Sequence, residues 1–166
     1  MLQAIQKNVT WRAIPVAGLA GGSVFLLTNV VLSPLVLDVN PTLLLRYFAA
    51  LVLGADVLTD TSTSAIIVGI LVHYAFSMIF ALVIAIVIHR WGLAVGIIGG
   101  AILGLSIYSI NLYTMTKYAE WFFAMNSSVL LLSHVLYGAV VGGVYEMLDH
   151  YDVALFSKEN THEQPA

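Results

Sequence analysis

The sequence contains no cysteine and few charged residues. The absence of cysteine excludes disulfide bonds, iron–sulfur clusters, thiolate metal sites and covalent c-type haem. Only 9% of the 166 residues are charged and only six are Lys or Arg, so the clustered positive charge that nucleic-acid binding requires is missing. The sequence also has no nucleophile–base pattern, phosphate-binding loop or zinc-protease motif. We therefore expect a protein that is not an enzyme and does not bind nucleic acid.

Apolar residues, in contrast, are abundant. They make up 60% of the chain, too many for the interior of a soluble domain of this length, so lipid must act as the solvent. Four stretches have the roughly 20 apolar residues that a bilayer crossing needs. These stretches cover about 13–33, 64–88, 93–115 and 127–148. The sequence therefore predicts an all-α integral membrane protein with four transmembrane helices in a domain that spans 13–148.

A fifth apolar stretch, at about 41–54, is too short to cross the bilayer and contains Arg46. Asn40 followed by Pro41 is typical of a helix start, and Gly54 is typical of a helix end. We expect a short interfacial or re-entrant helix here. The alternative is an amphipathic segment that covers the mouth of the helix bundle.

The basic residues predict how the chain is oriented. The positive-inside rule places the side with more Lys and Arg in the cytoplasm. Lys7, Arg12, Arg90 and Lys158 fall on one side of the predicted bundle, and Arg46 and Lys117 fall on the other. Both termini are therefore expected in the cytoplasm, as a short segment at 1–12 and a polar, acidic tail at 149–166. The last residues of the tail, 157–166, are expected to be disordered.

The four spans form two similar pairs. The first span contains Gly18-Leu19-Ala20-Gly21-Gly22, and the third contains the similar Gly96-Ile97-Ile98-Gly99-Gly100. In the second span His73 precedes small residues at helical spacing, and His134 does the same in the fourth. This internal repeat predicts two similar helix pairs, each with one histidine within the bilayer.

Glycines at intervals of four residues predict close packing of the helices. Helices in lipid associate through van der Waals contact over such small-residue faces. The candidate packing residues are Gly18 and Gly22 in the first span, Gly92, Gly96, Gly100 and Gly104 in the third, and Gly138 and Gly142 in the fourth. We expect these faces to hold a tight bundle together. The alternative is that they bind a helix of another protein.

Four polar residues are expected inside the bilayer, where ionisable groups are costly and often functional. They are Asn29, His73, Asn111 and His134. His73 follows the start of its span by about ten residues and His134 by about eight, and a helix rises roughly 1.5 Å per residue. The two histidines should therefore lie at the same depth on parallel helices, as b-haem ligation, a proton relay or a metal site would require.

The remaining residues argue against a cofactor at this pair. A metal site lacks a third ligand, because the nearest acidic residue, Glu146, lies three turns from His134 at the cytoplasmic edge. There we expect Glu146 to be an interfacial cap that faces water. Nothing marks a porphyrin pocket. We therefore expect each imidazole to form a structural hydrogen bond with a neighbouring helix. The candidate hydrogen-bond partners are Asn29, Ser77, Ser106, Tyr108, Ser109 and Asn111.

Several short motifs resemble those of a known family. They are Leu45-Arg46-Tyr47-Phe48-Ala49-Ala50, Leu71-Val72-His73-Tyr74-Ala75-Phe76-Ser77, Ile110-Asn111-Leu112-Tyr113, Trp121-Phe122 and Ser133-His134-Val135-Leu136-Tyr137-Gly138. In this order the chain resembles, from about Gly18 to Tyr145, a family of small uncharacterised bacterial four-helix inner-membrane proteins. The resemblance implies a location in the bacterial inner membrane and no established activity. It also implies that an acidic residue often stands where this chain has Asn29, a departure that favours a structural role.

These observations lead us to three hypotheses. The preferred one is a non-catalytic integral membrane subunit that packs against partner helices in a larger complex, such as an energy-converting or oxidase-type assembly, or against further copies of itself. The alternative is a small channel or carrier with a polar path past Asn29, His73, Asn111 and His134. The third is a bis-histidine b-haem protein.

Overall fold

The computed structural model describes residues 9–89 and 91–162, with the backbone alone from residue 150 onward. Within the described residues the chain is helical and contains no strand. Four helices are long and apolar enough to cross a membrane, which confirms the predicted fold class. The elements are α2 (Ala13–Leu37), α3 (Leu43–Leu53), η1 (Ala55–Thr59), α4 (Thr63–Ile88), α5 (Leu93–Tyr118), η2 (Glu120–Met125) and α6 (Ser128–His162).

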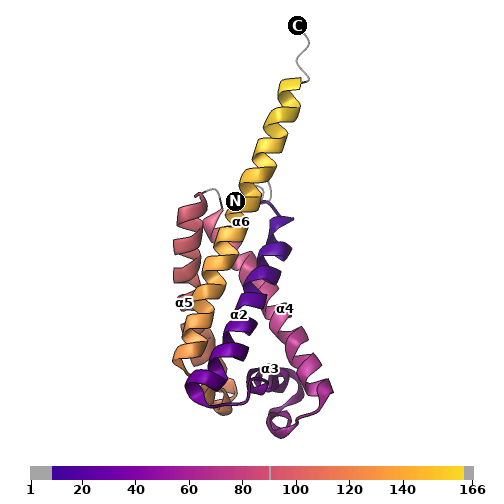
Figure 1. Cartoon of the computed structure of the whole chain (residues 1–166), viewed down its shortest axis with the longest axis vertical. Helices are drawn as coiled ribbons and strands as arrows, with labels where there is room; N and C mark the ends of the chain where they lie inside the picture. Colours follow the sequence, from indigo (N-terminus) through magenta and orange to yellow (C-terminus); the bar gives the residue numbers. More distant parts are fainter. Residues whose placement is uncertain (1–8, 90, 163–166) are drawn as a thin grey trace.

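The four long helices form one bundle with alternating directions (Figure 1). α2 and α5 run one way, and α4 and α6 run the other, so His73 and His134 do lie on parallel helices. α6 packs against both α5 and α2, and α2 also packs against α4. α4 and α5 follow one another in the chain but share far fewer contacts. The core of the bundle is therefore organised around α6 and α2.

The outer faces of these helices carry large apolar side chains. Leu27 of α2, Leu71 of α4 and Ile102 of α5 each have at least 60% of their surface exposed. Such exposure would be unfavourable in water and is what lipid-facing positions require. Away from its two ends, a helix satisfies its backbone N–H and C=O groups within the segment, as the bilayer interior demands.

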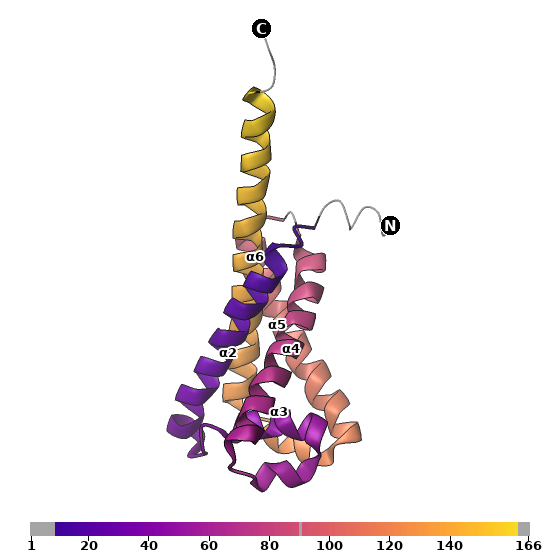
Figure 2. The same ribbon diagram turned by 90° about the vertical axis from the view of Figure 1, so that its right-hand side faces the viewer.

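The short helix that the sequence predicted at about 41–54 is α3. It lies across one end of the bundle, which we call the α3 end (Figures 1 and 2). It packs directly on α4 at Gly69, where an added Cβ would overlap the carbonyl of Leu45. Beside it, η2 turns Trp121 toward Tyr47, with the ring centroids 5.7 Å apart. Together α3 and η2 cover the α3 end, as the mouth-covering alternative also expected.

The opposite end of the bundle holds the start of α2 and the continuation of α6 (Figure 1). We call it the α2-start end. α6 does not stop with the other helices, because its backbone remains helical to His162 and projects as a single rod. The polar, acidic tail at 149–166 is thus helical over its described part, and the prediction of disorder from 157 onward is wrong as far as His162.

The two helix pairs use equivalent positions at their interfaces. In the first pair, Gly18 of α2 faces Ala81 of α4, and Gly22 faces Ser77. In the second pair, the corresponding Gly96 and Gly100 of α5 face Gly142 and Gly138 of α6. A Cβ on Gly100 would overlap the carbonyl of Gly138, so the backbones touch directly. The spacing in the sequence therefore predicted which faces pack, and these faces are filled within the chain.

Two glycines differ from that prediction. Gly92 has no heavy atom near its Cβ position, and its φ of +85° places it in the turn before α5, where an L side chain would be strained. It shares the four-residue spacing of the α5 face but not its packing role. Gly21, which the spacing did not select, packs against Tyr137 and Val141 of α6 instead. It allows the two helix pairs to approach each other.

The two ends of the bundle are packed differently. In Figure 2 the long helices lie closest together near the α2-start end and spread apart toward the α3 end. The close end contains side chains with 0% exposure from two of the helices: Ala81, Ile84 and Ala85 of α4, and Val141 and Tyr145 of α6. Three cavities among the described residues lie toward the other end.

Candidate functional site: a row of cavities beside two histidines

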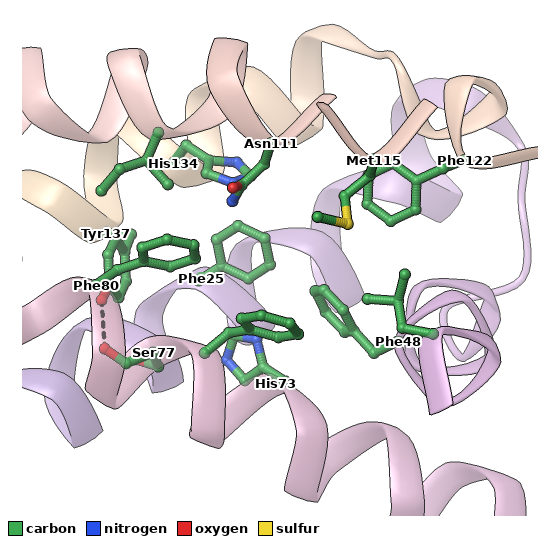
Figure 3. A pocket seen from close by; sticks show the side chains of 13 residues that line it. Phe25, Phe48, His73, Ser77, Phe80, Asn111, Met115, Phe122, His134 and Tyr137 are labelled. Atoms are coloured by element: carbon green, nitrogen blue, oxygen red, sulfur yellow. Dashed lines mark hydrogen bonds between the residues drawn. The ribbon is translucent and has the colours of Figure 1, made fainter. Parts of the chain in front are cut away.

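Phe25 of α2 lies between the two predicted histidines (Figure 3). Its ring stacks on His73 with centroids 5.1 Å apart, and it meets the ring of His134 edge-on at 4.9 Å. The two imidazoles are therefore close to the same depth, as their positions in the sequence predicted. They are separated by an apolar ring rather than in contact with each other.

Each imidazole donates a hydrogen bond to a backbone carbonyl. His73 Nε2 lies 3.0 Å from the carbonyl oxygen of Gly22 on α2. His134 Nδ1 lies 2.9 Å from the carbonyl oxygen of Leu130, one turn back on its own helix. The expected bond to a neighbouring helix is thus formed by His73 and not by His134. Because a carbonyl oxygen only accepts, these nitrogens carry the proton, and a neutral imidazole leaves a lone pair on His73 Nδ1 and on His134 Nε2.

This geometry favours neither haem nor a metal. Two axial imidazoles must face each other across an iron, and here the ring of Phe25 fills the space between them. No group of three His, Asp or Glu side chains within the described residues could hold a metal ion.

A cavity of about 60 Å³ opens beside the two histidines. Figure 3 shows that side chains of α5 and α6 border it on one side and side chains of α4 on the other. Its polar lining residues are His73, Ser77, Asn111, His134 and Tyr137, and its aromatic ones include Phe25, Phe48, Phe76, Phe80 and Phe122. We call this space the histidine cavity. It lies where α4 and α5, the sparsely packed pair, diverge.

Two further cavities continue from it toward the surface at the α3 end. The middle cavity, of about 40 Å³, shares Phe48, Asn111, Phe122 and His134 with the histidine cavity. The outer cavity, of about 70 Å³, shares Leu44 and Met125 with the middle one and is also lined by Asn29, Asn40 and Ser127. Each exceeds the roughly 10–15 Å³ needed for a water molecule. The three cavities therefore form a row, and the side chains that line two adjacent cavities separate them from each other.

The two asparagines occupy different positions in this row. Asn29 is 3% exposed, and its amide donates to the carbonyl of Phe25 at 3.0 Å and to the hydroxyl of Ser133 at 2.7 Å. Asn111 is half-buried and points into the histidine cavity (Figure 3), and it forms no hydrogen bond with the described part of the chain. Asn29 is thus a structural link between α2 and α6, whereas the amide of Asn111 is free to bind something else.

The histidine cavity ends at a set of hydrogen bonds that join three helices. The hydroxyl of Tyr137 on α6 donates to the carbonyl of Ser77 at 2.6 Å, and the hydroxyl of Ser77 donates to the carbonyl of Gly18 on α2 at 2.7 Å. Beyond these bonds lies the tightly packed α2-start end. The row of cavities is consequently open toward the α3 end and closed toward the other.

Other polar residues that the sequence named as partners of the histidines bond elsewhere. Ser106 and Ser109 donate to carbonyls of their own helix, at Ile102 and Leu105. The hydroxyl of Tyr108 donates to the side-chain oxygen of Asn126 at 2.7 Å, although its ring does contact the imidazole of His134. Of the candidate partners, none hydrogen-bonds either imidazole.

Glu146 corrects another expectation. It does not face water, because its side chain is only 1% exposed. Its carboxylate accepts the backbone N–H of Gly92 at 3.0 Å and of Trp91 at 3.4 Å, just before α5 begins. A negative charge at a helix N-terminus is stabilised by the unpaired N–H groups and the helix dipole. Glu146 therefore joins α6 to the start of α5.

The start of α2 is held in the same way by the next turn of α6. The hydroxyl oxygen of Tyr145 accepts the N–H of Thr10 at 3.1 Å, and the Thr10 hydroxyl donates to the carboxylate of Asp149. No pattern in the sequence identifies which helix either residue caps, because a residue on one helix that bonds the end of another has no fixed spacing along the chain.

Charged groups are absent from the described walls of the three cavities and begin just outside them. Arg46 of α3 donates from Nη1 to the carbonyl of Leu58 at 3.0 Å. Asp60 accepts from the backbone N–H and the hydroxyl of Ser62, and these bonds hold the pKa of the Asp60 carboxyl below its usual 3.8. Ser62 in turn caps α4 by accepting the N–H of Ala65.

Comparisons with protein families, curated proteins and solved structures gave no match to this chain.

Proposed function

We propose that this chain is a small, non-catalytic membrane carrier that takes a solute into the histidine cavity from the α3 end. One observation carries the proposal. Asn29, Asn111, His73 and His134, which the sequence placed on a polar path, each line at least one of three neighbouring cavities. Polar groups at this depth are costly in lipid, and a cavity that admits water or solute offsets that cost.

A solute on this path would have to pass the side chains that separate the cavities. Leu44 and Met125 separate the outer cavity from the middle one, and Phe48 and Phe122 stand between the middle cavity and the histidine cavity. Rotation of these side chains would connect the cavities without moving a helix.

Release on the other side requires a larger change, because the α2-start end is tightly packed. Carriers built from two similar halves alternate access by rocking one half against the other. Here the halves are the α2–α4 and α5–α6 pairs, and they meet where Gly21 packs on Val141. Gly21 contributes no side chain to this contact, which is made by Tyr137 and Val141 of α6.

The orientation follows from the charges, in a multi-pass protein of the bacterial inner membrane. The positive-inside rule places the α2-start end, with Arg12, in the cytoplasm and the α3 end, with Arg46 and Lys117, outside. The histidine cavity would then open outward and close inward.

Flux into proteoliposomes tests this proposal. We expect purified protein to increase the entry of small polar solutes, and His134→Leu and Asn111→Leu to reduce that entry at least severalfold. His89→Leu is the matched control, because His89 bonds the carbonyl of Ile86 at the end of α4 and does not line these cavities. Failure of the wild-type protein to move ions, protons or small polar solutes would contradict the carrier.

A second candidate, the non-catalytic subunit of a larger membrane complex, is favoured by α6. Its helical backbone continues to His162 beyond the bundle (Figure 1), and such a rod suits contact with a partner subunit on the cytoplasmic side. The glycine faces do not serve this role, since they are occupied within the chain. Mild detergent extraction and native gels test it: co-migration with another membrane protein, lost on truncation after Asp149, supports it, whereas migration as a monomer alone counts against it.

A further inference from the structure

We infer that the histidine cavity binds a small amine, held through its N–H groups. This inference rests on the proposed carrier function and names the class of its substrate. It follows from the hydrogen-bonding direction of the free polar atoms, from the rings around them and from the size of the space.

Two free polar atoms in the cavity accept hydrogen bonds, and they lie beside the free N–H donors of the Asn111 amide. Because His134 Nδ1 donates to the carbonyl of Leu130, its neutral imidazole keeps an unprotonated Nε2. That nitrogen has no partner within the described residues. The amide oxygen of Asn111 is a second free acceptor on the same cavity. A ligand that fits these atoms must therefore bring hydrogen-bond donors.

The surrounding rings favour a donor with positive character. Five phenylalanines line the cavity, and Phe25 and Phe48 both contact the ring of His73 at centroid distances of 5.1 and 5.2 Å. Aromatic faces attract ammonium groups, and this attraction is strongest where water is excluded. Protonated or neutral, an amine presents N–H groups and suits both the rings and the acceptors.

The space and the lack of charge limit what else can bind. At about 60 Å³ the cavity is far smaller than the roughly 300–1,000 Å³ of pockets for drug-sized ligands. A carboxylate or phosphate would find no cationic side chain on its described walls. Of the His, Asp and Glu side chains in the described chain, a metal ion here would find only His73 and His134, and Phe25 lies between them. A one-carbon amine meets all of these conditions.

Thermal unfolding of the detergent-purified protein tests binding without requiring transport. A ligand that binds only the folded state raises the unfolding midpoint as its concentration rises. The probe is methylammonium chloride, compared at equal ionic strength with sodium chloride and with tetramethylammonium chloride, which can contact the rings but has no N–H. We expect a rise with methylammonium alone. An equal rise with either of the other salts, or no rise with methylammonium, would overturn the inference.

Variants locate the effect. His134→Leu should abolish the rise and His89→Leu should retain it. Asn111→Leu provides a second test should His134→Leu fold poorly, because the Asn111 amide bonds nothing in the described chain and its loss should leave the bundle intact. A rise that both His134→Leu and Asn111→Leu retain would place the amine elsewhere and overturn the proposal.

Uptake of radiolabelled methylammonium into the same proteoliposomes separates this inference from the carrier function. Measurement at mildly acidic pH keeps passive entry of the neutral amine slow. Stabilisation by methylammonium without flux of any solute would support the binding site and contradict the carrier. Flux of other solutes without stabilisation by methylammonium would leave the carrier standing and overturn the amine.

Discussion

Phe25 contacts His73 and His134 at the same time, one face-on and one edge-on, and so links the two helix pairs through a single ring on α2. It is only 4% exposed. The two imidazoles are thereby kept apart, and each remains bound to a backbone carbonyl. The two histidines that the sequence suggested as a duplicated site therefore do not contact each other, and each packs separately against the ring of Phe25.

Replacement of that ring should destabilise the bundle. Phe25→Ala removes a buried side chain between two helix pairs, and such changes cost about 3–5 kcal/mol in well-packed cores. Unfolding in mixed micelles measures the loss. Phe123→Ala is the matched control, because Phe123 is 48% exposed and should change the stability little. Equal effects of the two substitutions would contradict the central position of Phe25.

The contact between α5 and α6 should tolerate no side chain at Gly100. In Gly100→Ala the new Cβ overlaps the carbonyl of Gly138, so the helices must separate, and we expect a large loss of stability. Gly99→Ala, one residue away, meets only a methyl of Ile88 at 3.6 Å and should be neutral or slightly stabilising. A thermal scan of both variants checks this, and equal loss would show that the two backbones are not in direct contact.

Removal of the Glu146 carboxylate should loosen the start of α5. Glu146→Ala leaves the N–H of Gly92 without its acceptor, which costs about 1–3 kcal/mol, whereas the N–H of Trp91 keeps its bond to the carbonyl of Ile88. Glu146→Gln keeps an acceptor oxygen and should therefore reduce the stability less than Glu146→Ala does. It loses only the attraction between the negative charge and the dipole of α5. Glu120→Ala, at an exposed position, serves as the control for loss of a carboxylate. Faster hydrogen exchange at the first turn of α5 is the expected signature of Glu146→Ala.

The α4 cap should weaken in acid. The pKa of Asp60 lies below 3.8 in the folded state, because Ser62 donates two hydrogen bonds to the ionised form. Between the pKa of Asp60 in the folded chain and its usual value of 3.8, the unfolded chain therefore binds more protons than the folded chain. The stabilisation that the ionised Asp60 gives the folded state is complete at pH values above about 3.8. It is lost as the pH falls through the pKa of Asp60 in the folded chain. Asp60→Asn should flatten this part of the stability-versus-pH curve. An unchanged slope would contradict the cap.

Asn29→Asp tests whether the position accepts the acidic residue that the family resemblance implies. The amide of Asn29 donates to Phe25 and to Ser133, and a carboxylate can donate to neither. The Ser133 hydroxyl already donates to the carbonyl of Val129. We expect a loss of about 1–3 kcal/mol for the unpaired acceptors, more if the carboxylate stays ionised. Asn29→Asp with wild-type stability would show that the surroundings of the amide adapt to an acid.

Much of the architecture could be predicted from residue periodicity and length. The four spans follow from runs of apolar residues, and α3 follows from a run that is too short between Asn40 and Gly54. The matched glycines also fixed which faces of α5 and α6 touch, because at a close helix crossing only glycine can stand opposite a carbonyl. These features depend on local pattern, which a sequence shows directly.

The candidate site depends on relations that no local pattern contains. Phe25 reads in the sequence as one more apolar residue of α2, and only the packing of three helices puts it between His73 and His134. The cavities arise where α4 and α5 diverge, and the chain gives no sign that these consecutive helices prefer other partners. The role of Glu146 as an acceptor could not be predicted, because it depends on the start of α5, which lies far from Glu146 in the sequence.

The caps that α6 provides have a consequence for how the protein is assembled in the membrane. Tyr145 and Glu146 satisfy the first N–H groups near α2 and α5, yet α6 is the last of the four spans to be synthesised. Until it is inserted, the earlier helices lack both these acceptors and the glycine face opposite α5. The bundle should therefore form late, in one cooperative step on arrival of the fourth span, and a chain truncated before Ser128 should stay loosely associated and open to membrane proteases.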